Sequence, residues 1–283
     1  MDIAYISLII FIIITIIYCF FGKVPITIGT GVVSEEDYFN ILSDVSNQNI
    51  MRLGIYFLIV IITQFVINTL YLINKCGGSA GNNIGGAALI TFLPWIFIFG
   101  AMIVILILFP GFKGAFSNVV GYFAISSSAN QILANILDTD TNIEDNMKKE
   151  GLSDEKKTDL KKTAELILKL CGNKSLLINQ MSPENFLGVW QMMKSLMKEN
   201  QGDFSKERQD LLNLVVMKDN IGEMMWYIYT GVLLTSIISF NLATRGCIKS
   251  AEQLKASHDE YLQQEEEVKK QKELNDSQTV TLT

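Results

Sequence analysis

Residues 87–109 read AALITFLPWIFIFGAMIVILILF and carry no charged side chain. As an α-helix with a rise of about 1.5 Å per residue, these 23 residues reach roughly 34 Å and can cross the hydrocarbon of a bilayer. Pro94 lies one third of the way along, where we expect a kink or a locally rearranged carbonyl. Pro110 cannot continue the helical hydrogen bonds, so the sequence predicts that this span ends there.

Three further runs are uncharged and long enough to span a bilayer, at residues 3–21, 54–74 and 224–244. The first is rich in isoleucine, which favours strands in water, but a helix in lipid satisfies every backbone group within one segment. It lacks the basic start and small-residue cleavage site of a secretory signal, so we expect a retained anchor. The sequence therefore predicts four transmembrane helices.

The composition agrees with an integral membrane protein. Of the 283 residues, 49% are hydrophobic and only 18% are charged, and the mean hydropathy is +0.29. Residues 110–223 hold 14 basic and 16 acidic side chains, and residues 245–283 hold 6 and 8. Neither segment carries the positive field that nucleic acid requires, so we expect a lipid bilayer as a partner and no nucleic acid.

The predicted fold class is all-α, an integral membrane protein with four transmembrane helices, a soluble helical segment between spans three and four, and a charged helical C-terminal tail. The predicted domains are a three-span anchor at 1–109 with an amphipathic loop at 22–53, an extramembrane helical bundle at 110–223, the fourth transmembrane helix at 224–244 and the charged helical tail at 245–283. We expect the amphipathic loop to pack on the membrane or on the bundle, rather than to remodel membranes.

Helical patterns within the bundle cover 118–137, run from Ser153 to Cys171, and begin again at Ser182-Pro183 and at Ser205, with a polar loop at 138–151. The helix from Ser205 can continue into the fourth span, because Gly222 is the only weak point between them. One helix carries a stripe of large apolar side chains, which we interpret as core rather than as an exposed groove. The stripe consists of Phe186, Trp190, Met193 and Met197.

Two lines of residues within the spans predict contacts between helices. Gln64 and Asn68 are four residues apart on one helical face and need polar partners in lipid. The small residues Gly231, Thr235 and Ser239 recur at every fourth position and allow a second helix to approach closely. A solute pathway is the alternative interpretation, but no span contains the ionisable side chain that coupled transport usually needs.

The chain leaves the third span through residues 110–122, PGFKGAFSNVVGY, which we call the assembly turn. Pro110 and Gly111 impose a sharp exit, and Gly114 and Gly121 allow close backbone approach. The rings lie at the depth of the headgroups, and Ser117 with Asn118 can cap the next helix. The turn is either an ordinary helix exit or the point that couples the anchor to an assembly. Its predicted interaction residues are Pro110, Gly111, Phe112, Lys113, Phe116, Ser117, Asn118, Gly121 and Tyr122.

The same turn resembles a sequence pattern found in membrane proteins of the nucleocytoplasmic large DNA viruses, which are associated with the inner membrane and with minor capsid components. This chain departs from the pattern at Phe112, where the family has Trp, and near Ala115, where it has Pro. The resemblance implies a structural virion protein in an internal membrane derived from the host. Such a protein anchors the internal membrane to capsid or other membrane proteins. The alternatives are a small channel or transporter-like protein, and a factor for virus uptake or membrane remodelling.

The residues that carry most enzyme chemistry are sparse. His258 is the only histidine and lies in the charged tail, so we expect no catalytic, cofactor or metal site and no enzyme activity. Cys171 is the single cysteine of the bundle. Cys76 and Cys247 each follow closely on a basic residue at the end of a span, where we expect unmodified thiols, with lipidation as the alternative. Basic residues lie at both ends of the spans, so the sequence does not indicate which end faces which side of the membrane. A homo-oligomer is a further possible partner.

Overall fold

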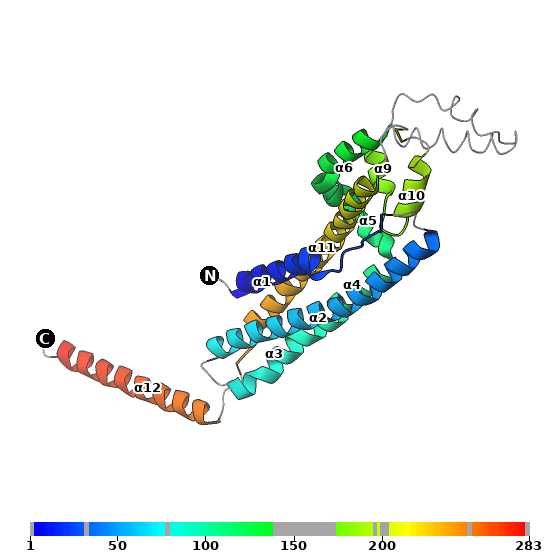
Figure 1. Cartoon of the computed structure of the whole chain (residues 1–283). Coiled ribbons are helices and arrows are strands. Elements are labelled where there is room, and N and C mark those ends of the chain that lie inside the picture. Colours follow the sequence, from blue (N-terminus) through cyan, green and yellow to red (C-terminus); the bar gives the residue numbers. More distant parts are fainter. Residues whose placement is uncertain are drawn as a thin grey trace, which may run out of the picture. The chain divides into compact units, whose positions relative to one another are not determined.

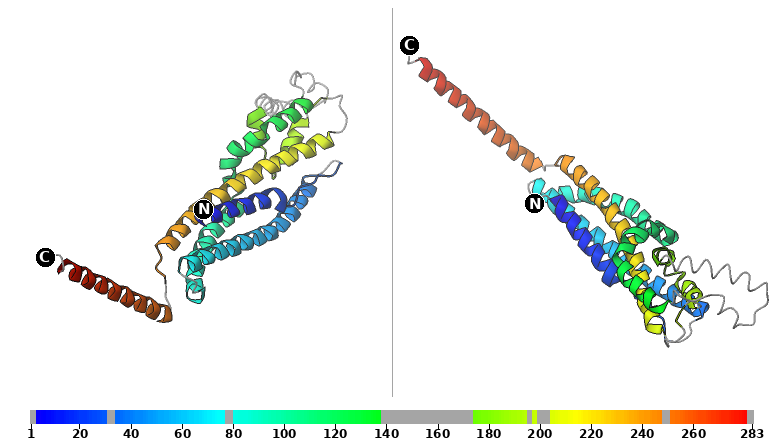
Figure 2. Two further views of the ribbon diagram at one scale, coloured as in Figure 1. Left: turned by 90° about the vertical axis from the view of Figure 1, so that its left-hand side faces the viewer. Right: turned by 90° about the horizontal axis from the view of Figure 1, so that it is seen from above.

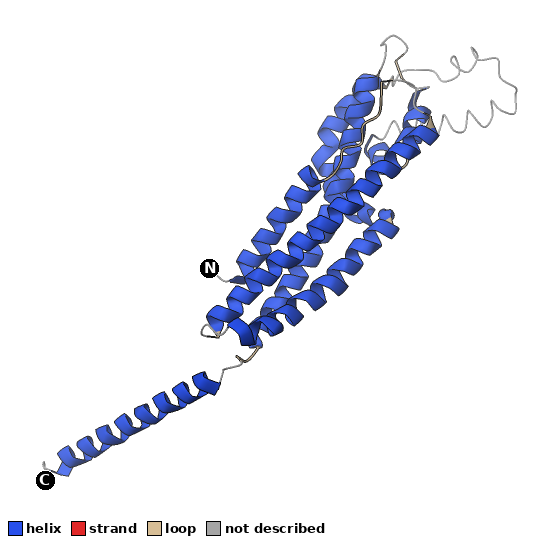
Figure 3. Cartoon of the chain, turned by 60° about the horizontal axis from the view of Figure 1, so that its bottom comes forward, coloured by secondary structure: helices blue, strands red, loops and turns tan. Residues whose placement is uncertain are grey.

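The computed structural model describes residues 3–30, 34–76, 80–137, 174–194, 197–198, 204–247 and 251–280. These residues are almost entirely helical, and the one β-type pairing among them is an isolated bridge between Leu137 and Met197 (Figure 3). Four helices are long and apolar enough to cross a membrane, which agrees with the four predicted spans. They cover Tyr5–Gly22, Glu35–Lys75, Asn83–Leu108 and Ser205–Thr244.

The first candidate span and the amphipathic loop are shaped differently from their prediction. Helix α1 covers Ile3–Ile17 and widens into a π-helical turn, η1, at Tyr18–Gly22. Helix α2 then runs without a break over Glu35–Lys75, so the helix of the loop and the second span are one element of 41 residues (Figure 1). Its first turn holds three acidic residues, and the Ser34 hydroxyl accepts a hydrogen bond from the Asp37 amide at 3.1 Å.

The third candidate span changes its winding after the proline. Helix α3 covers Ala80–Pro94, a π-helical turn, η2, covers Trp95–Phe99, and α4 covers Gly100–Leu108. A proline removes one backbone donor, and a wider turn is one way in which a helix accommodates that loss. The local rearrangement predicted at Pro94 is therefore present.

The assembly turn stays helical throughout. It forms a 3₁₀ turn, η3, at Pro110–Lys113, a short α5 at Gly114–Phe116 and a π-helical turn, η4, at Ser117–Gly121, and it continues directly into α6 at Tyr122–Ile136. Because η4 continues into α6 without a break, no side chain forms a capping hydrogen bond at the start of α6. The prediction that Ser117 and Asn118 cap the next helix is wrong for this reason.

The remaining elements are α9 at Lys174–Gln180, α10 at Phe186–Met193, α11 at Ser205–Thr244 and α12 at Ala251–Val280. Helix α10 begins later than predicted, because the Asn185 side chain accepts a hydrogen bond from the Ser182 amide at 2.8 Å and closes a turn first. Helix α9 was not predicted. The loop at 138–151 and the helix from Ser153 to Cys171 lie outside the described residues.

Helix α11 runs for 40 residues through Gly222 without a break, as its sequence allowed. Its first part, yellow in Figure 2, lies beside α6 in both views. There α6, α9, α10 and α11 bury a common apolar core, to which Tyr38 of α2 also belongs. The stripe on α10 is part of it, since Phe186, Trp190 and Met193 are buried and Met197 is partly buried. The prediction that this stripe is core is confirmed.

By its contacts the chain divides into two compact units, Met1–Ser7 with Ile61–Trp95 and Leu234–Thr283, and Leu8–Val60 with Ile96–Leu233. In the first unit, Gln64 exchanges two hydrogen bonds with Ser7 of α1 at 2.5 and 3.0 Å, and the Asn68 amide donates to Thr91 of α3 at 2.9 Å. Thr235 is buried there and Ser239 is half-buried. In the second unit, a Cβ atom on Gly231 would come within 2.0 Å of the Phe11 ring.

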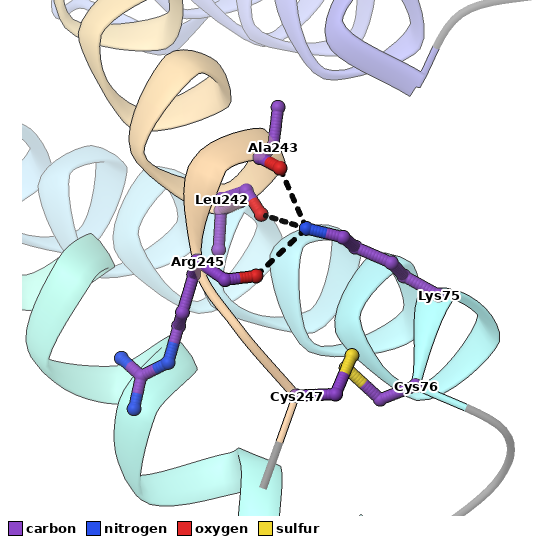
Figure 4. The surroundings of a disulfide bond; sticks show 6 residues. All are labelled: Lys75, Cys76, Leu242, Ala243, Arg245 and Cys247. Carbon is purple, nitrogen blue, oxygen red and sulfur yellow. Dashed lines mark hydrogen bonds between the residues drawn. A yellow bond between two sulfur atoms is a disulfide. The ribbon is translucent and has the colours of Figure 1, made fainter.

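The first unit also holds a disulfide between Cys76 and Cys247, whose Cα atoms are 5.4 Å apart (Figure 4). The expectation of unmodified thiols at these positions is therefore wrong. Beside the disulfide, the Lys75 ammonium donates hydrogen bonds to the carbonyls of Leu242, Ala243 and Arg245 at 3.0, 2.6 and 2.8 Å (Figure 4). A cation on the last carbonyls of α11 satisfies acceptors that the helix leaves open. This corner joins the end of α2 to the end of α11 twice.

Candidate coupling site

Four charged side chains meet in the second unit, where the assembly turn packs against α11. The Glu223 carboxylate lies 2.9 Å from the Lys23 ammonium and 3.2 Å from the Lys113 ammonium, and Lys113 also lies 3.0 Å from Asp219. Asp219 and Glu223 are four residues apart on α11 and so share one face. Lys23 follows η1, and Lys113 ends η3. We call these four residues the coupling site.

The coupling site is balanced in charge and largely removed from solvent. Only 7% of the Glu223 side chain is exposed, against 13% for Lys23, 16% for Lys113 and 18% for Asp219. Further hydrogen bonds support it, from the Tyr227 hydroxyl to Glu223 at 3.0 Å and from Lys23 to Asn220 at 2.9 Å. Burial alone would lower the pKa of Lys113, but the carboxylates of Glu223 and Asp219 outweigh it and raise that pKa above its ordinary value.

The backbone of the assembly turn contacts α11 directly. The Trp226 indole donates a hydrogen bond to the Phe112 carbonyl at 2.8 Å, and the Trp226 ring meets the Phe116 ring edge to face at 5.0 Å between centroids. Two glycines make the approach possible. A Cβ atom on Gly222 would lie 2.7 Å from the Lys113 carbonyl oxygen, and one on Gly121 would lie 2.6 Å from the Lys218 carbonyl oxygen.

A lysine of α11, Lys218, fixes α9 in the same unit. The buried Lys218 ammonium donates to the carbonyls of Ile178 and Asn179 at 2.9 and 3.3 Å, near the end of α9, and to the Asn118 side chain at 3.2 Å. These carbonyls belong to the last turn of a helix, where carbonyls lack the usual intrahelical partner, and that of Ile178 also accepts a hydrogen bond from the Met181 amide at 3.3 Å. Lys218 therefore holds α9 and the assembly turn to one point on α11.

The predicted interaction residues of the turn divide between two faces. Ser117 and Gly121 are buried, and Lys113, Phe116 and Tyr122 are partly buried against the chain itself. Those on the outside are Pro110, Gly111, Phe112 and Asn118. The inner face of the turn thus contributes to folding, and docking of a partner by its outer face stays a prediction.

Sequence reasoning missed Lys23, Asp219 and Glu223 as partners of the turn. A signal was present, since two carboxylates four residues apart stand immediately before an uncharged span, while single lysines stand at the ends of two other spans. Charges in such positions at the edge of a bilayer are expected to pair. What the pattern lacked was the pairing partner for each charge.

A pocket of about 200 Å³ opens beside the coupling site, lined in part by Ser46, Asn49 and Glu184. Within the described residues no group of three or more His, Cys, Asp or Glu side chains could hold a metal ion. The arrangement joins charges from three separate elements into one network, and its chemistry is that of ion pairs and hydrogen bonds. The chain matches no protein-family model, and no curated protein or solved structure shows significant similarity to it.

Proposed function

We propose that this chain is a non-enzymatic structural membrane protein, which anchors a helical head to a bilayer and presents it to a protein assembly. The head consists of α6, α9, α10 and the first part of α11. The observation that carries the proposal is the continuity of α11, which runs from the buried core of the head into an apolar stretch long enough to cross a membrane. Force on such a head passes directly into the membrane anchor.

The coupling site supports this role. The chain connects the head to the apolar stretches through α11 and through the assembly turn after α4, and Glu223 and Asp219 add ion pairs to Lys23 after α1 and to Lys113 after α4. Helix α11, Lys23 and Lys113 each stand at the end of a different apolar stretch, so the head is held at three separate points. A head held in this way keeps its orientation when a partner binds, which is what an anchor between a membrane and a protein shell needs.

The setting that we propose is the internal membrane of a large DNA virus, with capsid or other membrane proteins as partners. It rests on the resemblance of residues 110–122 to the membrane proteins of those viruses. The outer face of the assembly turn also exposes Val119 and continues into Phe123 of α6, so that 52% of Phe112, 55% of Val119 and 75% of Phe123 is exposed. Exposed rings and branched apolar side chains fit a protein contact made at the membrane surface.

This role predicts that the outer face of the assembly turn is needed for assembly but not for insertion. In the variant Phe112→Ser, Val119→Ser, Phe123→Ser, we expect normal membrane insertion and at least tenfold less incorporation into virus particles, about 1.4 kcal/mol or more of lost contact. Incorporation is measured by blotting purified particles, and insertion by extraction of infected-cell membranes with carbonate.

The matched control is Ser126→Ala on α6, whose hydroxyl is exposed and bonds only its own helix at 3.4 Å. It should insert and assemble as the unaltered chain does. Full incorporation of the triple variant would show that this face does not bind the shell, and the structural role would then need another surface.

A solute pathway is the second candidate function, and the pocket at the coupling site favours it because charged and polar groups line it. Ion flux through vesicles that contain the purified chain would support this alternative. Flux that disappears in Glu223→Gln would assign it to the coupling site, whereas no flux above that of empty vesicles favours the anchor.

The disulfide predicts how the chain is oriented. If all four helices cross, Cys76 and Cys247 lie on the face opposite the head, and a disulfide persists on an oxidising face. We therefore expect a maleimide–polyethylene glycol reagent to label the two cysteines only after reduction of opened vesicles. Protease added to the face opposite them should cleave the head. Labelling of both without a reductant would contradict this orientation.

A further inference from the structure

The second unit contains a groove of about 450 Å³ between α1 and α2. Four isoleucines line it, Ile14 and Ile17 from α1 and Ile55 and Ile59 from α2. About half of each of the side chains of Ile17, Ile55 and Ile59 is exposed, at 54%, 53% and 47%. A groove of branched aliphatic side chains between two candidate spans presents a surface that an acyl chain can fill.

The floor of the groove is built from two tyrosines that are held in place. The rings of Tyr18 and Tyr56 stack with their centroids 4.3 Å apart and 14° between their planes. The Tyr56 hydroxyl is bonded to the Thr15 hydroxyl at 2.9 Å and is buried, so the groove meets the ring and not its polar group. This wall is therefore apolar and preformed.

Arg52 stands at one end of the groove, beside Gly22. Its side chain is exposed, and its Nη1 donates one hydrogen bond, at 2.9 Å, to the carbonyl of Gly22, where η1 ends. In the part of the chain that the structure describes, no carboxylate pairs with Arg52, whereas the neighbouring Lys23 pairs with Glu223. A planar guanidinium with donors to spare suits a phosphate group.

We propose that this groove binds one anionic phospholipid, with an acyl chain along the isoleucines and its phosphate on Arg52. The inference rests on the proposed placement of α1 and α2 across a bilayer. In that placement Arg52 lies where the apolar stretch of α2 begins, at the depth of the headgroups, and the isoleucines lie at the depth of the acyl chains. The cation supplies selectivity for anionic headgroups, and the groove supplies contact area.

A second groove provides an internal comparison. It measures about 530 Å³, lies between α2 and the η2–α4 segment, and includes Gly54, Phe57 and Gly100 in its lining. Its lining residues are all uncharged, so it offers an acyl chain a similar space without a partner for a phosphate. Lipid in this second groove should show no preference for an anionic headgroup.

The test uses the full chain in vesicles of phosphatidylcholine with a minor fraction of phosphatidylglycerol. Lipids that remain bound after gentle detergent extraction are counted by native mass spectrometry. We expect phosphatidylglycerol to be enriched about fivefold over the bulk, as roughly 1 kcal/mol per basic residue implies. Arg52→Gln keeps hydrogen-bond donors but removes the charge, so it should reduce this enrichment to near one. Ile55→Trp fills the groove and should remove the bound lipid.

The control is Gly100→Leu, which fills the second groove and should leave the enrichment of phosphatidylglycerol unchanged. Extraction with carbonate is run on every variant, because a chain that fails to insert contradicts the proposed anchor rather than the lipid site. Normal insertion with equal enrichment in the unaltered chain and in Arg52→Gln would overturn the lipid site. Loss of bound phosphatidylglycerol on addition of inorganic phosphate alone would likewise show a general anion site instead of a lipid site.

Discussion

Replacing Glu223 by glutamine is expected to lower the free energy of unfolding of the second unit by about 3–5 kcal/mol. Glutamine has nearly the same volume, so the packing stays while the carboxylate that faces Lys23 and Lys113 is lost. Two ammonium groups then share one remaining carboxylate, Asp219, in a largely buried place. Denaturant unfolding in detergent micelles, followed by hydrogen exchange of the assembly turn, measures the change.

Two controls separate charge from packing. Asp219→Asn should cost less, because Lys113 keeps its contact with Glu223 at 3.2 Å. The double variant Lys23→Met, Glu223→Gln removes one cation together with its partner, so it should be more stable than Glu223→Gln alone. The difference from the sum of the two single variants gives the coupling energy of the pair. If Glu223→Gln were as stable as the unaltered chain, the coupling site would be hydrated and would not hold the turn to α11.

Much of the architecture is readable from the sequence because lipid restricts the choice of structure. Each uncharged run of suitable length became a long helix, and Gly222 did not interrupt α11, because one glycine costs about 1 kcal/mol while the flanking residues supply the packing of a whole face. The uncharged run of the second span begins at Gly54, after Arg52, but α2 has no boundary there. The end of an uncharged run marks where a span can begin and not where its helix begins.

The pairing of distant residues was the part that could not be predicted. Lys23 and Glu223 are separated by two hundred positions, and the sequence around each residue does not indicate that the other is its partner. Cys76 and Cys247 were correctly expected at the same kind of helix end, but pattern alone does not give the 5.4 Å between their Cα atoms. Such contacts depend on which helices are neighbours, which a single sequence does not contain.

Trp190→Ala is expected to destabilise the head by about 3–5 kcal/mol, the cost of truncating a buried aromatic side chain. Only 3% of Trp190 is exposed, and its ring stacks on Phe186 with centroids 6.1 Å apart. The cavity would open in the common core of the head, where α10 packs with α6, α9 and α11. Hydrogen exchange of the full chain should show earlier opening of α6 and α9, since they share that core.

Gln191→Ala, on the exposed side of the same helix, is the matched control and should change the stability by no more than about 0.5 kcal/mol. The comparison distinguishes two roles for the stripe on α10. Unaltered exchange in Trp190→Ala together with weaker incorporation into particles would mean that the tryptophan binds a partner. Faster exchange in Trp190→Ala alone means that the stripe holds the head together, and that binding of a shell falls to surfaces such as the outer face of the assembly turn.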